Sequence, residues 1–306
     1  MGELIEAMES ALAAFSSGRV LQPVRTAFEI GEMAFFALMP ACDHEHSILG
    51  AKLVSVIAAN ASRGLPTHLA AISLFDPATG ELLAVMDGRY ITEVRTAAVS
   101  AVSVRHLARA DASVLAILGS GVQARSHLAA LPLVRPFKEI RAWSPTPDHL
   151  RRFVAGAGAP VRAAQSAEEA VRGADVVVLA TSSVAPAIQD GWVREGAHVI
   201  AVGACRPTHR EIDPALVARA CLVVDSKVAA LQESGDVVEA IREGRFGENH
   251  IHAELGQVVS GQAPGRSGPL EITLFKSLGL AIEDLVAANL AYRRARTTGR
   301  GTLVSL

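Results

Sequence analysis

The stretch Ile117–Leu128, "ILGSGVQARSHL", is the most informative short segment of this sequence. It places Gly119, Gly121 and Ala124 directly after an apolar run and before a helix-like segment. In a dinucleotide-binding turn the first glycine permits the turn, the second lets the backbone approach a pyrophosphate, and a small third residue lets helix and strand pack. The helix N-terminus also offers free N–H groups to phosphate. We predict a dinucleotide site here, with a plain strand-to-helix turn as the alternative.

The chain around this turn alternates between apolar runs and helix-like segments. Short apolar runs without polar alternation are typical of strands that are covered on both faces. Strands and helices that take turns along the chain predict a parallel, doubly wound α/β sheet of the Rossmann type. The runs are "SVLAILG", "EIRAW", "DVVVLAT", "AHVIAVGA" and "CLVVDS", and the helix-like segments between them are 123–131, 166–173, 212–220 and 226–243.

The N-terminal third follows a different pattern. Two strand-like runs lie within 32–58, and "HLAAISLFDPATGELLAVMDG" predicts a β-hairpin with its turn at 76–80. Apolar residues three and four apart between 94 and 108 then predict a helix. Near the other end, 269–296 is expected to form a helix of about five turns or more, by the same periodicity. The segment 261–269, "GQAPGRSGP", is the most linker-like part of the chain.

Composition excludes several classes of function. The 306 residues are 50% hydrophobic and carry a formal net charge of −2, so no basic surface indicates nucleic acid or anionic lipid. The three cysteines lack C-x-x-C spacing, which favours a reducing compartment. The N-terminus does not resemble a signal peptide, and no apolar run reaches the roughly 18 residues of a membrane span. We therefore expect a cytoplasmic protein with neither a nucleic-acid nor a membrane partner.

The second strand of the parallel sheet bears on the choice of dinucleotide. NAD-binding folds usually end this strand with an acidic residue, but "EIRAW" is followed by Ser144-Pro145-Thr146. Without a carboxylate to repel a 2′-phosphate, and with Arg141 or Arg151 nearby, NADP(H) is favoured over NAD(H); ordinary loop residues are the alternative. The predicted cofactor-binding residues are Gly119, Ser120, Gly121, Val122, Gln123, Ala124, Ser144, Thr146, Val202 and Gly203.

Motifs along nearly the whole chain resemble the ornithine cyclodeaminase/mu-crystallin family, with the ketimine reductase branch the most similar. The resemblance implies a homodimer and a mixed α+β outer domain, built from both chain ends, beside the Rossmann domain. It suggests an outer domain of 1–111 and 266–306 and a dinucleotide domain of 112–265. The motifs are "QPVRT" (22–26), "LGAKLV" (49–54), "LLAVMDG" (82–88), "RTAAVSAV" (95–102), "ILGSGVQA" (117–124), "GADVVV" (173–178), "AVGACRP" (201–207), "ESGDV" (233–237), "AELG" (253–256) and "FKSLGLAIED" (275–284).

The same resemblance implies roles for individual residues. Arg25 and Arg95 match arginines that hold a substrate carboxylate, which a guanidinium can grip bidentately. Lys52 matches the family's active-site lysine, and a lysine within the apolar run "ILGAKLVSVI" should need a partner. Without the motifs, the two arginines would be interpreted as surface residues. Lys52 would be interpreted as a lysine whose side chain extends to solvent. Three further residues match positions that line the substrate pocket: Thr67, Leu278 and Gly279.

One departure from the family pattern points to the reaction. Where the cyclodeaminases and alanine dehydrogenases of the family carry an aspartate, this chain has Ala204. Deamination of ornithine needs a group that handles protons at the reacting carbon, whereas reduction of a preformed cyclic imine does not. We therefore expect an NAD(P)H-dependent reductase of small cyclic imine carboxylates, such as pyrroline-2-carboxylate or piperideine-2-carboxylate, with Lys52 and Arg95 as catalytic residues.

Two other functions stay open at this point: an ornithine cyclodeaminase, and a non-catalytic NADPH-gated binding protein. Asp225 and Asp236 are expected to be structural at least as much as functional, and His127 to lie on a helix surface. His68, His198 and His209 lack the spacing of metal ligands, so no metal is expected.

Overall fold

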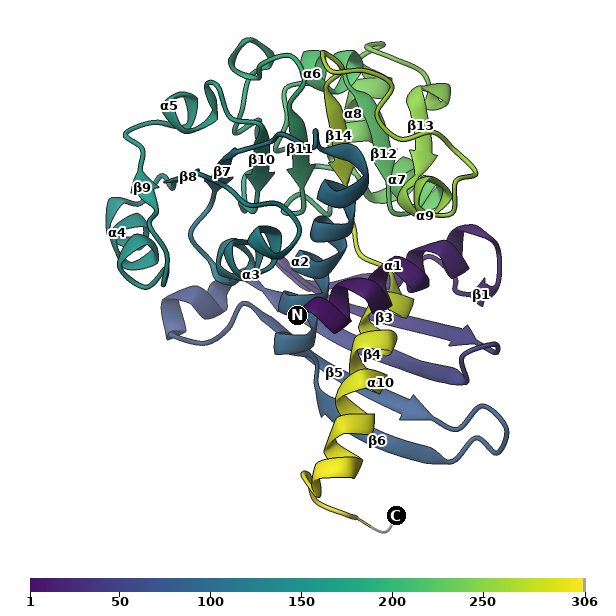
Figure 1. Cartoon of the computed structure of the whole chain (residues 1–306). Coiled ribbons are helices and arrows are strands. Elements are labelled where there is room, and N and C mark those ends of the chain that lie inside the picture. The colour runs from purple at the N-terminus through teal and green to yellow at the C-terminus, as the bar shows by residue number, and fades with distance from the viewer. Residues whose placement is uncertain (305–306) are drawn as a thin grey trace.

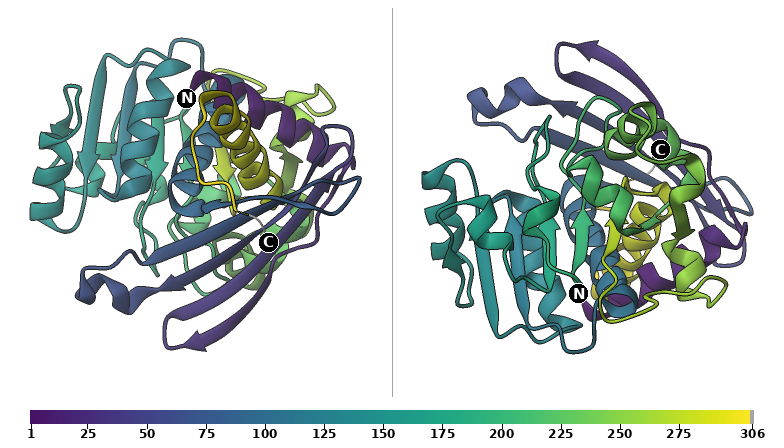
Figure 2. Two further views of the ribbon diagram at one scale, coloured as in Figure 1. Left: turned by 90° about the horizontal axis from the view of Figure 1, so that it is seen from below. Right: turned by 90° about the horizontal axis from the view of Figure 1, so that it is seen from above.

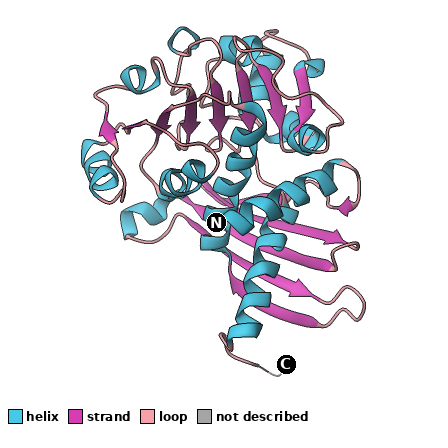
Figure 3. Ribbon diagram, in the orientation of Figure 1, coloured by secondary structure: helices cyan, strands magenta, loops and turns pink. Residues whose placement is uncertain are grey.

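The computed structural model describes residues 1–304 and builds them around two β-sheets, drawn one above the other in Figures 1 and 3. The strands are β1 (Val20–Leu21), β2 (Thr26–Gly31), β3 (Ala34–Asp43), β4 (Ile48–Ile57), β5 (His68–Phe75), β6 (Leu82–Asp87), β7 (Val114–Leu118), β8 (Glu139–Trp143), β9 (Arg162–Ala163), β10 (Val176–Leu179), β11 (His198–Ala201), β12 (Cys221–Val224), β13 (Ile251–Glu254) and β14 (Thr273–Lys276).

Helices cover both sheets, and the described part of the chain has four short 3₁₀ helices, at 58–63, 131–133, 190–192 and 248–250. Within residues 1–304, no helix is long and apolar enough to cross a membrane. The α-helices are α1 (Gly2–Ser16), α2 (Gly88–Leu107), α3 (Val122–Ala130), α4 (Pro147–Ala155), α5 (Ala167–Val171), α6 (Pro214–Arg219), α7 (Lys227–Glu233), α8 (Gly235–Arg242), α9 (Leu255–Val259) and α10 (Ala281–Thr298).

The parallel sheet confirms the predicted Rossmann-type α/β fold. Its order is β13-β12-β14-β11-β10-β7-β8-β9, and every neighbouring pair is parallel. Strands β10 and β11 are buried along their whole length, as expected of strands covered on both faces. Strand order reverses between β7 and β10, and ligands of such sheets bind at the carboxyl ends beside this reversal.

The antiparallel sheet, of order β1-β3-β4-β5-β6 with β2 paired to β3, has one covered face and one open face. Residues in β4 alternate, so that Lys52 and Val54 are buried while Leu53 between them is 41% exposed. Helix α10 packs on the covered face against β3, β4 and β5, and α2 runs between the two sheets, as Figure 2 shows from below and above. The predicted hairpin is confirmed as β5 and β6.

The C-terminal part of the chain differs from the expected long helix. Residues 273–276 form β14, which lies between β11 and β12 in the parallel sheet, and the helix begins only at Ala281. The apolar run "ITLF" fits a buried strand as well as a helix, and its place in the sheet decides between them. A strand from the segment assigned to the outer domain thus belongs to the other sheet; the division into two domains stays a prediction.

His127 is not on a helix surface, as the sequence suggested. Helix α3 packs against α2, and the His127 imidazole is fully buried between them. Its Nδ1 is 2.7 Å from the carbonyl oxygen of Gln123, and its Nε2 is 2.8 Å from Ser100 Oγ. Burial lowers the pKa of His127 to about 4, so the ring is neutral and accepts the serine hydrogen bond.

Candidate active site

The glycine turn stands at the carboxyl edge of the parallel sheet, directly after β7. Gly119 follows β7 with a φ of +115°, and a Cβ there would lie 2.3 Å from the carbonyl oxygen of Ala180, the residue after β10. Only glycine tolerates this conformation and this approach. Nothing lies within 4 Å of a Cβ added at Gly121, whereas Ala124 is fully buried where α3 meets β7. These three positions therefore have the geometry that a pyrophosphate-binding turn needs.

The other predicted cofactor residues surround this turn. Ser120 Oγ donates to Ser144 Oγ at 3.0 Å, which joins the glycine turn to the loop after β8. Gln123 points toward α2: its Nε2 lies 3.5 Å from the Thr92 carbonyl oxygen, and its buried Oε1 has no partner within residues 1–304. Four further predicted residues are more peripheral or follow another strand: Val122 is 50% exposed, Thr146 is exposed before α4, and Val202 and Gly203 follow β11. The arrangement fits a bound dinucleotide.

Lys52 and Arg95 meet around two carboxylates at the start of α10. Lys52 Nζ donates to Asp284 Oδ2 at 2.5 Å, and Arg95 Nε donates to Asp284 Oδ1 at 2.9 Å. Arg95 Nη1 also donates to Glu283 Oε2 at 2.6 Å. Lys52 is 2% exposed and Arg95 4% exposed, while both carboxylates are fully buried. The partner that a lysine in an apolar strand requires is therefore Asp284.

Ionisation in this cluster follows from burial and from the charges within it. Burial lowers the pKa of Lys52 to about 8, although the Asp284 carboxylate opposes that shift. Burial also raises the pKa of Glu283 to about 7, against the effect of Arg95. Burial would raise the pKa of Asp284 as well, but Arg95 and Lys52 outweigh it and hold that pKa below its ordinary value. The cluster thus holds a lysine that can lose its proton near neutral pH.

Arg25 reaches the same region from the segment before β2. Its Nη2 donates to the carbonyl oxygens of Leu278 and Gly279 at 2.8 and 3.1 Å, and its Nε donates to Glu233 Oε2 at 3.1 Å. The amides of Leu278 and Gly279 donate in turn to Asp225 Oδ2 at 2.5 and 2.6 Å. Asp225 therefore has a structural role: it holds the loop that positions Arg25.

Gly279 also brings Arg95 close to this loop. Its φ is +84°, and a Cβ there would lie 2.6 Å from Arg95 Nη1. A side chain at this position would be strained and would push the guanidinium away. The structure thus brings together five of the six predicted substrate residues: Arg25, Lys52, Arg95, Leu278 and Gly279.

Thr67 is the predicted substrate residue that the structure does not bring into this cluster. Thr67 is exposed just before β5. The residue whose pKa is affected by the charges of the cluster is its neighbour, His68. Burial, followed by the charge of Lys52, lowers the pKa of His68 to about 4, so His68 is neutral at neutral pH. Because successive side chains of a strand point to opposite faces, His68 and not Thr67 shares the face of Lys52.

Sequence reasoning missed three acidic residues of the site: Glu233, Glu283 and Asp284. Glu283 and Asp284 stand in "FKSLGLAIED", a motif recognised only as a family signature. The available signal was their place in the first turn of a helix, because carboxylates are favourable near a helix N-terminus. That signal explains acidic residues, but it does not identify the cations that they bind.

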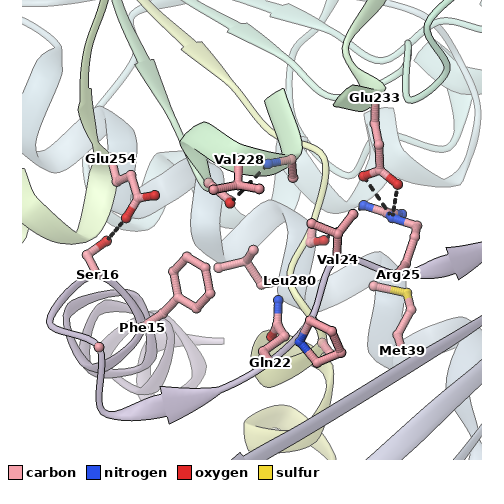
Figure 4. Close-up of a pocket in the computed structure, with 16 residues that line it drawn as sticks. Phe15, Ser16, Gln22, Val24, Arg25, Met39, Val228, Glu233, Glu254 and Leu280 are labelled. Atoms are coloured by element: carbon pink, nitrogen blue, oxygen red, sulfur yellow. Dashed lines mark hydrogen bonds and ion pairs between the residues drawn. The ribbon is translucent and has the colours of Figure 1, made fainter. Parts of the chain in front are cut away.

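A cavity of about 430 Å³ adjoins Arg25. Figure 4 shows Arg25 paired with Glu233 on one side of it, and Phe15, Val24, Val228 and Leu280 around it. Its lining includes Gly279 but neither Lys52 nor Arg95, so the cavity reaches only the Arg25 side of the cluster.

A second, basic cavity of about 210 Å³ lies beside the glycine turn. It is lined by Ser120, Arg125, His149 and Arg152, which come from the glycine turn, α3 and α4. Within residues 1–304, neither Arg125 nor Arg152 forms an ion pair. The two arginines that the sequence suggested are engaged elsewhere. Arg141 pairs with Glu139 and donates to the carbonyl oxygen of Arg172, and Arg151 pairs with Asp148.

Ala204 lies in the loop after β11, 1% exposed. Its amide donates to Glu211 Oε2 at 3.0 Å, as does the amide of Gly203 at 2.7 Å. Asp236 Oδ1 accepts from the Glu211 amide at 2.8 Å, and Asp236 Oδ2 is 3.0 Å from Lys276 Nζ. Asp236 therefore has a structural role. The two carboxylates near this loop, Glu211 and Asp236, already bind backbone amides, and Asp236 also pairs with Lys276.

Comparison with known proteins identifies the family. The model of the ornithine cyclodeaminase/mu-crystallin family matches residues 1–299. The ketimine reductase mu-crystallin of Rattus norvegicus is 45% identical over 94% of this chain and 91% of its own length.

Two solved structures are similar over nearly the whole chain. The Delta(1)-pyrroline-2-carboxylate reductase of Thermococcus litoralis, in complex with NADH and L-proline, is 40% identical with a TM-score of 0.96, covering 99% of this chain and 96% of its own. An archaeal alanine dehydrogenase dimer with bound NAD is 34% identical with a TM-score of 0.95, covering 100% of this chain and 95% of its own. The chain therefore belongs to the ornithine cyclodeaminase/mu-crystallin family.

Proposed function

We propose that this protein is an NAD(P)H-dependent reductase of small cyclic imine carboxylates. The observation that carries the proposal is the group of three cations, Arg25, Lys52 and Arg95, beside the loop 277–279 at the carboxyl edge of the parallel sheet. Relatives at 45% and 40% identity are a ketimine reductase and a pyrroline-2-carboxylate reductase, both of which reduce a C=N bond.

In the proposed reaction Arg25 and Arg95 hold the substrate carboxylate, as a guanidinium does with paired hydrogen bonds. When bound, the reduced nicotinamide supplies the hydride that the imine carbon receives. Lys52 donates a proton to the imine nitrogen, so that C=N becomes CH–NH, and the neutral amine of Lys52 then regains a proton from water. A pKa of about 8 suits this task, because the ammonium is present at neutral pH and gives up its proton readily.

A substrate panel tests this function. Purified protein is mixed with pyrroline-2-carboxylate or piperideine-2-carboxylate and either reduced cofactor, and oxidation of the nicotinamide is followed by absorbance. We expect consumption of at least one imine, and no ammonia from L-ornithine with catalytic NAD, because Ala204 offers no proton-handling group. Robust ammonia and proline formation from ornithine would restore the cyclodeaminase assignment. Cofactor binding without turnover of any imine would favour a binding protein.

We further propose that NADP(H) is favoured over NAD(H), with the 2′-phosphate in the basic cavity. No acidic residue stands among Ser144, Pro145 and Thr146 directly after β8, and Arg125, His149 and Arg152 line a space of about 210 Å³ beside the glycine turn. Arginine suits phosphate because its planar N–H groups match the phosphate oxygens. The arginines first suggested by the sequence, Arg141 and Arg151, have no role in the proposed binding of the 2′-phosphate.

Replacing Arg125 or Arg152 by alanine is expected to raise the KM for NADPH about tenfold and to leave the KM for NADH nearly unchanged. A hydrogen bond to a charged group contributes about 1.5–3 kcal/mol, and about 1.4 kcal/mol is a tenfold change; these side chains are exposed, so we take the lower end. Arg151→Ala is the matched control, since Arg151 pairs with Asp148. Equal losses with both cofactors, or a wild type that rejects NADPH, would contradict the proposal.

A homodimer is also proposed. The open face of the antiparallel sheet carries apolar side chains that fall on one face by strand register. They are Phe28 (57% exposed), Leu38 (39%), Leu53 (41%), Leu69 (37%) and Val85 (62%). Such a surface is typical of a protein–protein interface, and the similar archaeal alanine dehydrogenase is a dimer.

A further inference from the structure

The Asp284 carboxylate is the only one that contacts both Lys52 and Arg95 within residues 1–304. It lies in the first turn of α10, where that helix meets β4 and α2. Its Oδ2 accepts from Lys52 Nζ and its Oδ1 from Arg95 Nε, at 2.5 and 2.9 Å. Thr92 Oγ1 is 3.5 Å from the same Oδ1. One rigidly held carboxylate thus spans the two cations to which we assign the chemistry.

We propose that Asp284 is a positioning residue for imine reduction: it fixes the distance between the Lys52 ammonium and the Arg95 guanidinium, and it keeps Lys52 protonated inside an apolar environment. The proposal rests on the proposed function of Lys52 as proton donor. Asp284 does not itself donate the proton to the imine nitrogen, because its ion pairs with Lys52 and Arg95 lower its pKa and keep it an ionised carboxylate.

The groups around Lys52 explain why one carboxylate matters so much. Arg95 faces Lys52 from α2, Arg25 approaches from the segment before β2, and His68 lies on the neighbouring strand β5 with its pKa lowered to about 4, hence uncharged. Burial and both arginines lower the pKa of Lys52, and Asp284 is the group that raises it. Removing the Asp284 charge therefore leaves burial and the two arginines acting against the ammonium form.

Glu283 provides a matched comparison from the same helical turn. It is fully buried like Asp284, and its Oε2 accepts from Arg95 Nη1 at 2.6 Å. Within residues 1–304 it forms neither a hydrogen bond nor an ion pair with Lys52. A change at Glu283 disturbs Arg95 and the packing of α10 but leaves the ion pair of Lys52 in place, so the two positions separate a structural effect from an effect on the proton donor.

The test compares pH profiles of kcat for wild type, Asp284→Asn and Glu283→Gln, with saturating cyclic imine and reduced cofactor. If protonated Lys52 is required, kcat falls as pH rises through its pKa in the enzyme–substrate complex. Loss of a neighbouring opposite charge shifts a pKa by about 1–3 units. We expect this falling limb to move down by at least about one pH unit in Asp284→Asn and to stay nearly in place in Glu283→Gln. An unmoved limb in Asp284→Asn, or an equal movement in both variants, would overturn the proposal.

A second variant covers the case in which Asp284→Asn does not fold. Asp284→Ala leaves space for a small carboxylate, and added formate is expected to restore both kcat and the position of the limb, whereas chloride at equal ionic strength is not. Absence of rescue in folded Asp284→Ala counts against the proposal. The proposed function is tested separately with Lys52→Met. A fully active Lys52→Met variant would refute Lys52 as the proton donor. If Lys52→Met is inactive but the falling limb of the pH profile does not move in Asp284→Asn, only the role of Asp284 is refuted.

Discussion

Replacing Lys52 by methionine is expected to lower kcat for a cyclic imine carboxylate by roughly 10²–10⁴-fold, the usual contribution of a positioned acid. The methionine side chain is similar in length to that of lysine and is apolar and flexible, so the 2% exposed site can accommodate it. Asp284 keeps Arg95 as its partner in the variant. The loss should therefore appear in kcat more than in folding, and stopped-flow measurement of nicotinamide oxidation would quantify it.

A second buried lysine supplies the control for that experiment. Lys276 is fully buried and its Nζ lies 3.0 Å from Asp236 Oδ2, but it belongs to the ion pair behind the loop after β11 and has no assigned role in the reaction. Like Lys52→Met, the variant Lys276→Met removes a buried ammonium. It leaves Asp236 without its lysine partner, as Lys52→Met does for Asp284. A drop in kcat as deep as that of Lys52→Met would show that general disruption, and not loss of the proton donor, accounts for the result.

Replacing Arg95 by alanine is expected to lower the free energy of unfolding by about 3–5 kcal/mol, the cost of removing one partner from a buried ion pair. Arg95 is 4% exposed, and its guanidinium is the partner of both Glu283 and Asp284, which are fully buried. Burial has already raised the pKa of Glu283 to about 7, and loss of Arg95 removes the charge that opposes that rise. The variant is thus expected to lose both stability and substrate binding, as urea unfolding and kinetics would report.

Two further variants separate these effects. Arg95→Lys keeps a positive charge between the carboxylates but loses the paired N–H groups that fit a substrate carboxylate, so we expect a smaller loss of stability and a raised KM. Arg89→Ala, at a partly exposed arginine in the first turn of the same helix, should change stability by no more than about 0.5 kcal/mol. If Arg95→Ala proved as stable as Arg89→Ala, the buried ion pairs of Arg95 would not stabilise the fold as expected.

Local patterns were enough to predict much of the fold. The alternation of apolar runs and helices after residue 112, the hairpin at 68–87 and the glycine turn are confirmed, because each depends on residues that are neighbours in sequence. Strands β13 and β14 and helix α4 were missed. "ITLF" can form a strand or a helix, and only the gap between β11 and β12 selects the strand. Likewise His127 looks like a surface residue until α3 packs on α2.

The family, the glycine turn and the candidate cations Arg25, Lys52 and Arg95 could be predicted from the sequence, since each is recognisable within a motif of a few residues. The carboxylates that those cations meet became visible only when the chain was folded. Lys52 and Asp284 are 232 positions apart and meet at 2.5 Å because α10 lies across the covered face of the antiparallel sheet. The energy of an ion pair depends on the distance between its charges and on their burial. For Lys52 and Asp284 both are set only when α10 packs on the antiparallel sheet. The chemistry of the lysine was therefore unknown until its partner was placed.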